Sequence, residues 1–297
     1  MPHPLIFDRR LLRARRMRAA AACDPATFLI ERAADDLAGR LSAVLRKFDL
    51  AVDLGTPTDA VRRALADRVG AIVAVDPVAS QLAGERLAVA ADEEALPFRD
   101  ASLDLVVSAL ALQFVNDLPG TLIQIRRALR PDGLFLAAMI GGDSLAELRE
   151  AFAQAEAEVE GGVSPRVAPF ADLRDLGALL QRAGFALPVT DVDRLTVRYA
   201  SPLALMHDLR RMGASNALSE RRRTLLRRAT LHRVFEIYAE RFADPDGRIR
   251  ATFEIVWLSG WAPHESQQQP LKPGSAKTRL ADALRTQEVS AGEKAGD

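Results

Sequence analysis

The sequence predicts an α/β fold: one mostly parallel sheet of seven strands with helices on both faces. Short apolar segments alternate with segments of helical apolar spacing, and this strand–helix–strand alternation requires parallel neighbours. Acidic residues stand at the ends of the first three strands, where open α/β sheets bind their ligands. Hydrophobic residues make up 48% of the 297 residues and charged residues 27%, the balance of an ordinary globular domain.

The first half of the chain supplies five of these strands and the helices that connect them. Residues 24–47 carry apolar side chains at helical spacing, with Asp24 as a cap and Pro25 in the first turn, so they predict a helix ahead of the sheet. Further helices are predicted at 57–68 and 118–129, the second closed by a turn at 130–133. Short buried strands are predicted at 50–55, 71–75, 87–90, 103–108 and 134–140.

The second half continues the alternation. Asp143 is expected to cap one helix, and Gly184 to end another. Ser201 opens a helix that runs to about residue 212, and residues 218–242 predict a long basic helix. The last two strands are predicted at 189–199 and 251–261.

The domain organisation follows from these elements. Residues 1–47 are predicted to form N-terminal helices packed on the domain, and residues 48–263 the sheet domain itself, with a helical insertion at about 200–245. From residue 264 to 297 the chain is polar, so we expect a flexible tail there. All seven strands fit one sheet, so one domain is expected.

The composition excludes several classes of protein. Forty basic residues balance forty acidic ones, which argues against nucleic acid as a partner because such binding depends on neutralising phosphates. A single cysteine, Cys23, allows no internal disulfide and indicates a reducing compartment. The four histidines have no spacing typical of a metal site, and no apolar segment approaches the length of a membrane span.

The N-terminal segment is rich in arginine and allows two interpretations. Its composition is that of a transit sequence, but a solvated basic face on a first helix is the favoured interpretation. We therefore place the protein in the bacterial cytoplasm, with the mitochondrial matrix as the alternative.

Three acidic residues mark a candidate nucleotide site. Asp53 ends the first strand, Asp76 ends the second, and Asp92 follows the third. A carboxylate at the end of the second strand can accept hydrogen bonds from both ribose hydroxyls, and one after the third can pair with an adenine amino group. Each aspartate alone would be unspecific, but three in register predict a shared ligand.

Residues 92–98 and 102–108 closely resemble the middle of the class I S-adenosylmethionine (SAM) methyltransferases, whose fold is Rossmann-like. The later segments narrow this resemblance to the complex I assembly factors described as protein arginine hydroxylases. Those segments are 115–119, 130–133, 141–149, 161–170, 212–216 and 260–267, together with 6–10 near the start. The methyltransferase that acts on a malonyl carrier protein is a more distant relative, similar mainly in the first half.

The resemblance implies SAM as cofactor and a complex I subunit as protein substrate, modified on an arginine. It also implies transient contact with membrane-side assembly intermediates. The residues expected to bind the cofactor are Asp53, Gly55, Asp76, Pro77, Asp92, Glu93 and Ser108. Two alternatives stay open: a conventional methyltransferase acting on a small molecule or acyl carrier, and a non-catalytic assembly chaperone.

The first loop departs from the family's acid-x-Gly-x-Gly-x-Gly pattern. Only Gly55 is kept, while Pro57 and Asp59 occupy the other two glycine positions. Proline donates no N–H, and a carboxylate at Asp59 would oppose the methionine carboxylate. Two unit charges about 5 Å apart at an effective dielectric of about 20 repel by roughly 3 kcal/mol. The same residues also suit a helix start, with Pro57 in its first turn and Asp59 at its positive end.

No catalytic residue can be assigned from the sequence. Gln113 and Phe114 stand where related proteins often have histidine and an aromatic residue, so no general base is expected there. His207 and His264 each precede an acidic residue but lack the spacing of an iron site. Two larger groups have structural interpretations: a core role for Tyr199, Trp257 and Trp261, and a solvated helical face for Arg221–Arg223 with Arg227 and Arg228.

Overall fold

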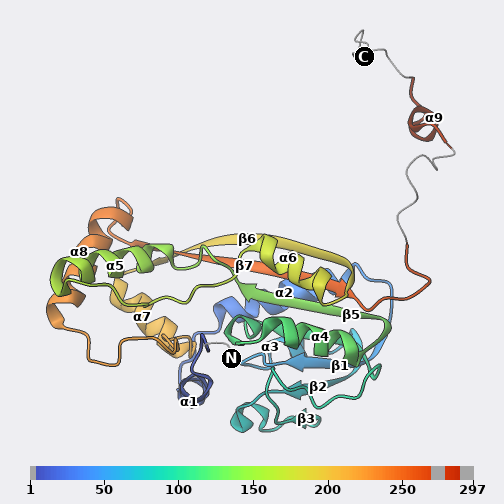
Figure 1. The fold of residues 1–297 in the computed structure, drawn as a ribbon, viewed down its shortest axis with the longest axis horizontal. Helices are drawn as coiled ribbons and strands as arrows, with labels where there is room; N and C mark the ends of the chain where they lie inside the picture. Colours follow the sequence, from blue (N-terminus) through green and yellow to red (C-terminus); the bar gives the residue numbers. More distant parts are fainter. Residues whose placement is uncertain (1–4, 269–277, 288–297) are drawn as a thin grey trace. The chain divides into compact units, whose positions relative to one another are not determined.

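Seven strands form one sheet in the order β3-β2-β1-β4-β5-β7-β6 (Figure 1). Only β7 runs against its neighbours, pairing antiparallel with both β5 and β6. The predicted α/β fold with a mostly parallel, seven-stranded sheet is therefore confirmed. The strands are β1 (Phe48–Leu54), β2 (Val69–Val75), β3 (Ala88–Val89), β4 (Leu103–Ala109), β5 (Leu129–Ile140), β6 (Ala186–Tyr199) and β7 (Ile249–Trp261).

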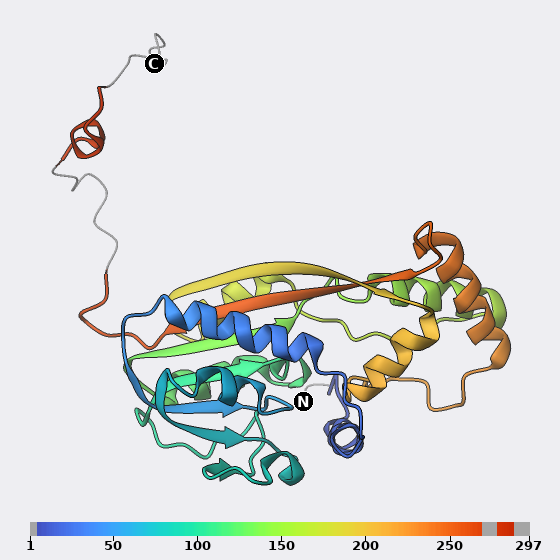
Figure 2. The ribbon, with the colours of Figure 1, turned by 180° about the vertical axis from the view of Figure 1, so that it is seen from behind.

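Helices cover both faces of the sheet. Apolar side chains of α2 (Phe28–Ser42) and α3 (Ala60–Leu65) pack with β1, β4 and β7 into one buried cluster. On the other face, α4 (Leu118–Ala128) and α6 (Leu173–Arg182) pack against the same strands, and Figure 2 shows α2 and α3 in front of the sheet. The central strand β4 is buried along its whole length, as a strand covered on both faces should be.

A third apolar cluster lies where β6 and β7 extend beyond the parallel strands. It joins α5 (Ala146–Glu160), α7 (Pro202–Arg211) and α8 (Arg228–Phe242) to the ends of the two long strands. We call this region the helical end. Tyr199 and Trp257 are buried in the core, and Trp261 packs against it, which agrees with the structural interpretation of all three aromatic residues.

The computed structural model describes residues 5–268 and 278–287. Two compact units are distinguished, Met1–Pro263 and His264–Asp297. The first contains the whole sheet, and the second contains the short helix α9 (Leu280–Leu284). None of the described helices combines the length and apolarity that a bilayer crossing requires.

Several predicted boundaries were wrong for identifiable reasons. The helix expected at 218–242 begins only at Arg228, because the residues before it form a bridge, one turn and irregular chain, in which Arg221 pairs with Asp8 and Arg222 with Glu160. The turn expected at 130–133 lies inside β5, where a register shift against β4 and a positive φ at Asp132 absorb the bend. Asp143 does not cap α5, whose N-cap is Leu145; instead Asp143 pairs with Arg194.

The first helix, α1 (Arg9–Ala20), lies beside the C-terminal end of α7 in both ribbon views (Figures 1 and 2). Phe7 precedes it and forms an antiparallel bridge with Leu218. The amide of Asp8 donates to the Ala217 carbonyl at 2.8 Å, while the Asp8 side chain caps the helix through the Leu11 amide. The N-terminal segment is thus attached to the loop that follows α7.

Candidate functional site

The structure brings Asp53, Asp76 and Asp92 to one edge of the sheet. Asp53 and Asp76 end the paired parallel strands β1 and β2, in which Asp53 is in register with Ala74 and Leu54 with Val75. Asp92 follows β3, the next strand outward. Because the carboxyl ends of parallel strands meet at one edge, three separate sequence positions become neighbours. We call Asp53, Asp76, Asp92 and the adjoining Glu93 the acidic edge.

Burial perturbs the carboxyl groups of this edge. It raises the pKa of Asp53 to about 7, although Arg62, which forms an ion pair with Asp53, opposes the rise. Burial likewise raises the pKa of Asp76 to about 6, against the opposing charge of Arg16. At Asp92 burial is outweighed by the hydrogen bond from the Glu94 amide and by Arg9, so the pKa there is lowered. Such shifts mark a cluster of charge held partly out of water.

The arginines of α1 neutralise this edge. Arg9 contacts both Asp92, at 2.8 Å, and Glu93, and Arg13 contacts Asp92. Arg16 lies 3.2 Å from the Glu93 carboxylate and 3.9 Å from that of Asp76. The expectation of a solvated basic face on the first helix was therefore wrong for Arg9, Arg13 and Arg16, which turn toward the carboxylates of the acidic edge, while Arg10 and Arg18 are exposed as expected.

Gly55 makes the turn that joins the acidic edge to the rest of the site. Its φ of +71° favours glycine, and a Cβ there would lie 2.7 Å from Oε1 of Glu93. Its amide donates to the Val75 carbonyl at 2.7 Å, and its carbonyl accepts from Arg16 at 2.6 Å. The one glycine that remains in this loop is thus required by both the backbone and the close approach of Glu93.

Asp59 lies at the positive end of a helix, as expected, whereas Pro57 does not lie in the first turn of that helix. Helix α3 begins at Ala60 with Asp59 as its N-cap, so Pro57 lies outside the first turn. The Ala60 amide donates to Oγ1 of Thr58 at 3.2 Å, and the Asp59 side chain accepts no capping hydrogen bond. Asp59 pairs with Arg63 at 3.1 Å and is half exposed, which reduces the repulsion it would exert on an incoming carboxylate.

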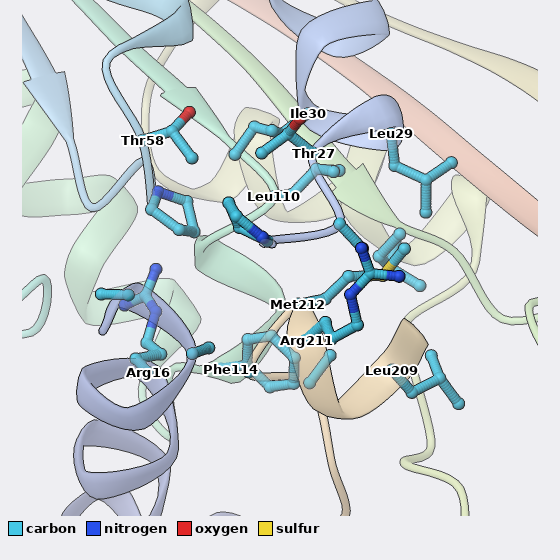
Figure 3. A pocket seen from close by; sticks show the side chains of 18 of the residues that line it. Arg16, Thr27, Leu29, Ile30, Thr58, Leu110, Phe114, Leu209, Arg211 and Met212 are labelled. Atoms are coloured by element: carbon cyan, nitrogen blue, oxygen red, sulfur yellow. The ribbon is translucent and has the colours of Figure 1, made fainter. Parts of the chain in front are cut away.

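A cavity of about 380 Å³ lies next to the acidic edge. Figure 3 shows its walls: α1 with Arg16, the start of α2 with Leu29, and the end of α7 with Met212. The loop at 57–59 and the segment after β4, with Gln113 and Phe114, complete it. Apolar side chains make up most of the lining, as is typical of pockets for small ligands, and the polar groups include Arg16, Asp59 and Arg211.

Gln113 is a functional candidate to which the sequence analysis assigned no role. Its side chain is only 8% exposed and lines the cavity. Nε2 donates to the Leu110 carbonyl at 2.8 Å, while Oε1 is buried with no hydrogen-bond partner among the described residues. A buried acceptor of this kind is costly unless a ligand supplies the donor. The signal for Gln113 in the sequence was its position after the fourth strand.

The remaining predicted residues have mixed placements. Pro77 follows Asp76 and is half-buried, whereas Ser108 is fully buried and donates to the Leu54 carbonyl at 2.7 Å, so its hydroxyl serves the sheet and does not line the cavity. His207 and His264 lie in different compact units. Within residues 5–268 and 278–287, no group of three or more potential metal ligands gathers.

The acidic edge offers an acceptor that the ribose of SAM requires. Oδ2 of Asp76 is buried and accepts no hydrogen bond from any described residue, although a ribose offers two hydroxyl donors. Oδ1 of the same residue accepts from the Val78 amide at 2.6 Å, which fixes the carboxylate in place. The residues present therefore fit a nucleoside, and among the described residues Arg9, Arg13 and Arg16 lie against the same carboxylates.

The comparisons with known proteins agree with this geometry. The family described as "Methyltransferase domain" matches residues 52–137, which span β1 to β5. The arginine-hydroxylase NDUFAF5 of Danio rerio is 39% identical and that of Homo sapiens 41%, each over 93% of this chain, and over 89% and 83% of those proteins respectively. A malonyl-[acyl-carrier protein] O-methyltransferase of Halorhodospira halophila is 37% identical over 86% of this chain and 88% of that protein.

Solved structures support the same fold. A putative methyltransferase from Bacillus halodurans superposes with a TM-score of 0.54 at 18% identity, covering 76% of this chain and 99% of the other. The sheet order, the acidic edge and the relatives that match nearly the whole sequence lead to one assignment. The chain belongs to the family of the mitochondrial arginine-hydroxylase NDUFAF5, within the SAM-dependent methyltransferases.

Proposed function

We propose that this protein modifies an arginine of a respiratory complex I subunit during assembly, with SAM bound along the acidic edge. The name of the relatives that match nearly the whole chain supports an arginine as the target. The proposal depends on one observation: the acidic edge lies beside a largely apolar cavity. A nucleoside at the acidic edge and a target side chain in the cavity would therefore bind next to each other.

Each residue of the acidic edge has a proposed role toward the cofactor. Asp76 accepts the ribose hydroxyls, while Asp92 and Glu93 with the half-buried Pro77 border the adenine. Gly55 keeps the turn open, Asp53 holds α3 through Arg62, and Ser108 supports the turn through the Leu54 carbonyl. SAM, when bound, supplies an electrophilic methyl group on its sulfonium, which would face the cavity.

The cavity is proposed to hold the target arginine. Oε1 of Gln113 needs a donor, and a guanidinium supplies five N–H groups. Phe114 and Phe170 line the same cavity and pack edge to face at 6.4 Å between ring centroids, which presents aromatic surface to a planar cation. We place the protein in the bacterial cytoplasm, with the mitochondrial matrix as the alternative.

The test compares complex I from cells with and without the gene. Peptide mass spectrometry of the subunits should show one arginine that lacks one oxygen atom, or one methyl group, in the deletion strain. The wild-type gene should restore the modification and Asp76→Ala should not, while Asp100→Ala, at an exposed aspartate paired with Arg127, serves as the matched control. Unchanged masses in every subunit would contradict an arginine-modifying role.

A non-catalytic assembly chaperone is the second candidate, and the loop at 57–59 with Arg16 lodged in the acidic edge favours it. In that case an Asp76→Ala, Asp92→Ala double variant should still restore complex I to a deletion strain. A conventional methyltransferase acting on an acyl carrier would instead consume SAM and leave complex I intact. The three functions thus give three different patterns in the same strains.

A further inference from the structure

Helix α1 places three arginines on one face, directly over the acidic edge. Arg9, Arg13 and Arg16 are spaced as neighbours on a helix surface. Together they contact Asp92, Glu93, Asp76 and the Gly55 carbonyl. Asp92 and Glu93 are therefore already bonded to side chains of this chain, while Oδ2 of Asp76 has the Arg16 guanidinium 3.9 Å away and accepts no hydrogen bond from a described residue.

Arg16 is the most deeply placed of the three. It is only 5% exposed, with Nη2 at 2.6 Å from the Gly55 carbonyl and Nη1 at 3.2 Å from Glu93 Oε1. The same Nη1 lies 3.9 Å from Asp76 Oδ2. A ribose hydroxyl must come within about 2.8 Å of that oxygen to form a hydrogen bond. A ribose bonded to Oδ2 would thus lie beside the Arg16 guanidinium and compete with it for the space next to Asp76.

We propose that α1 is an intramolecular competitor of the cofactor: Arg16 occupies the ribose position, and α1 must withdraw before SAM binds. This inference rests on the proposed placement of the nucleoside at the acidic edge. It explains how buried carboxylates are stabilised without a ligand, because Glu93 is fully buried and its charge is balanced by Arg9 and Arg16.

The far side of α1 is attached to a wall of the cavity. A Cβ on Gly213 would lie 3.2 Å from the Arg16 Cα, so the helix packs directly on the turn after α7. Arg15 donates to the Asn216 carbonyl, and Arg221 pairs with Asp8 at 3.2 Å. Because Met212 and Gly213 line the cavity, withdrawal of α1 also moves the wall against which a target side chain would lie.

A closed resting state lowers apparent affinity by the fraction of molecules that are open. Titration calorimetry with S-adenosylhomocysteine should therefore show that Arg16→Ala binds about tenfold more tightly than the wild type, a change of about 1.4 kcal/mol. Arg18→Ala is the matched control, because Arg18 lies on the same helix, is exposed, and among residues 5–268 and 278–287 bonds only to the Ala14 carbonyl of its own helix. Its affinity should stay within about twofold of the wild type.

Equal or weaker binding by Arg16→Ala would overturn the proposal, since Arg16 would then be neutral or a ligand of the cofactor. A second variant covers the case in which Arg16→Ala folds poorly. Arg15→Ala releases α1 from Asn216 without touching the acidic edge, and it should tighten binding by about two- to fivefold. No gain from Arg15→Ala would contradict the proposal as well.

Hydrogen exchange gives a readout independent of affinity. Saturating S-adenosylhomocysteine should speed the exchange of the α1 amides in the wild type, because the ligand holds the helix away. Slower exchange would mean that α1 closes over the ligand, and would overturn the proposal. If all variants bind S-adenosylhomocysteine with the same affinity, the proposal that α1 competes with the cofactor is contradicted, but the proposed cofactor site is not. If neither the wild type nor any variant binds it, the proposed cofactor site is contradicted as well.

Discussion

The acidic edge and the helical end are built on opposite principles. The acidic edge holds buried carboxylates whose charges are balanced by arginines from α1 and α3. The helical end holds α5, α7 and α8 together through an apolar cluster, and its ion pairs are mostly exposed, such as that of Arg233 with Glu158 at 2.6 Å. The helical end also buries one carboxylate, Glu156, against Arg166. The difference is therefore one of degree: a cluster of balanced charges organises the acidic edge, whereas apolar packing holds most of the helical end together.

The largest expected effect breaks the charge balance of the acidic edge. Glu93→Ala leaves Arg9 and Arg16 with one buried partner fewer and should lower the free energy of unfolding by about 4 kcal/mol. Urea denaturation measures this value. Glu158→Ala removes a carboxylate from the exposed network of the helical end and should cost less than about 1 kcal/mol. Similar losses in the two variants would remove the contrast between the regions.

Packing at the helical end is tested by Leu205→Ala. Leu205 is fully buried on α7, so its truncation should cost about 3 kcal/mol. Leu203→Ala on the same helix is the control, because that side chain is exposed and its loss should cost less than about 1 kcal/mol. At temperatures where both variants are folded, their affinity for S-adenosylhomocysteine should match the wild type. A parallel loss of affinity would show that the two regions are coupled.

Titration of Asp53 sharpens the comparison further. Burial raises its pKa to about 7, above the value of the unfolded chain, so its protonated form favours the folded state. The contribution of Asp53 to the free energy of unfolding is complete at low pH and is lost as the pH rises through about 7. Between pH 6 and pH 8 the free energy of unfolding should therefore fall by about 1.4 kcal/mol because of this group. Asp53→Asn should abolish this pH dependence. Asp100→Asn, at an exposed carboxylate, should leave the slope unchanged.

The smallest expected effect concerns the altered glycine loop. Asp59 is paired with Arg63, so Asp59→Asn should change affinity for S-adenosylhomocysteine by less than about threefold. Calorimetry of a Pro57→Gly, Asp59→Gly variant separates the effect of the backbone from that of the charge. A gain of about a hundredfold from Asp59→Asn would show that the unscreened repulsion of roughly 3 kcal/mol is present after all.

The strands and the acidic edge were predictable because they depend on local patterns. Apolar segments ending in Asp53 and Asp76 place two carboxylates at one edge of any parallel sheet. The inward turn of Arg16 was not predictable, since its partner Glu93 is 77 positions away and a basic helix face looks the same whether solvated or paired. The start of α8 was missed for the same reason: Arg222 pairs with Glu160, a contact that no local pattern reveals.

The position of β7 has a consequence for synthesis of the protein. It is the last strand along the chain, yet it lies between β5 and β6 in the sheet. During synthesis, β6 therefore has no strand to pair with until residues 249–261 have left the ribosome. Ribosome-bound chains stalled ahead of that segment should expose the unpaired edges of β5 and β6 to chaperones.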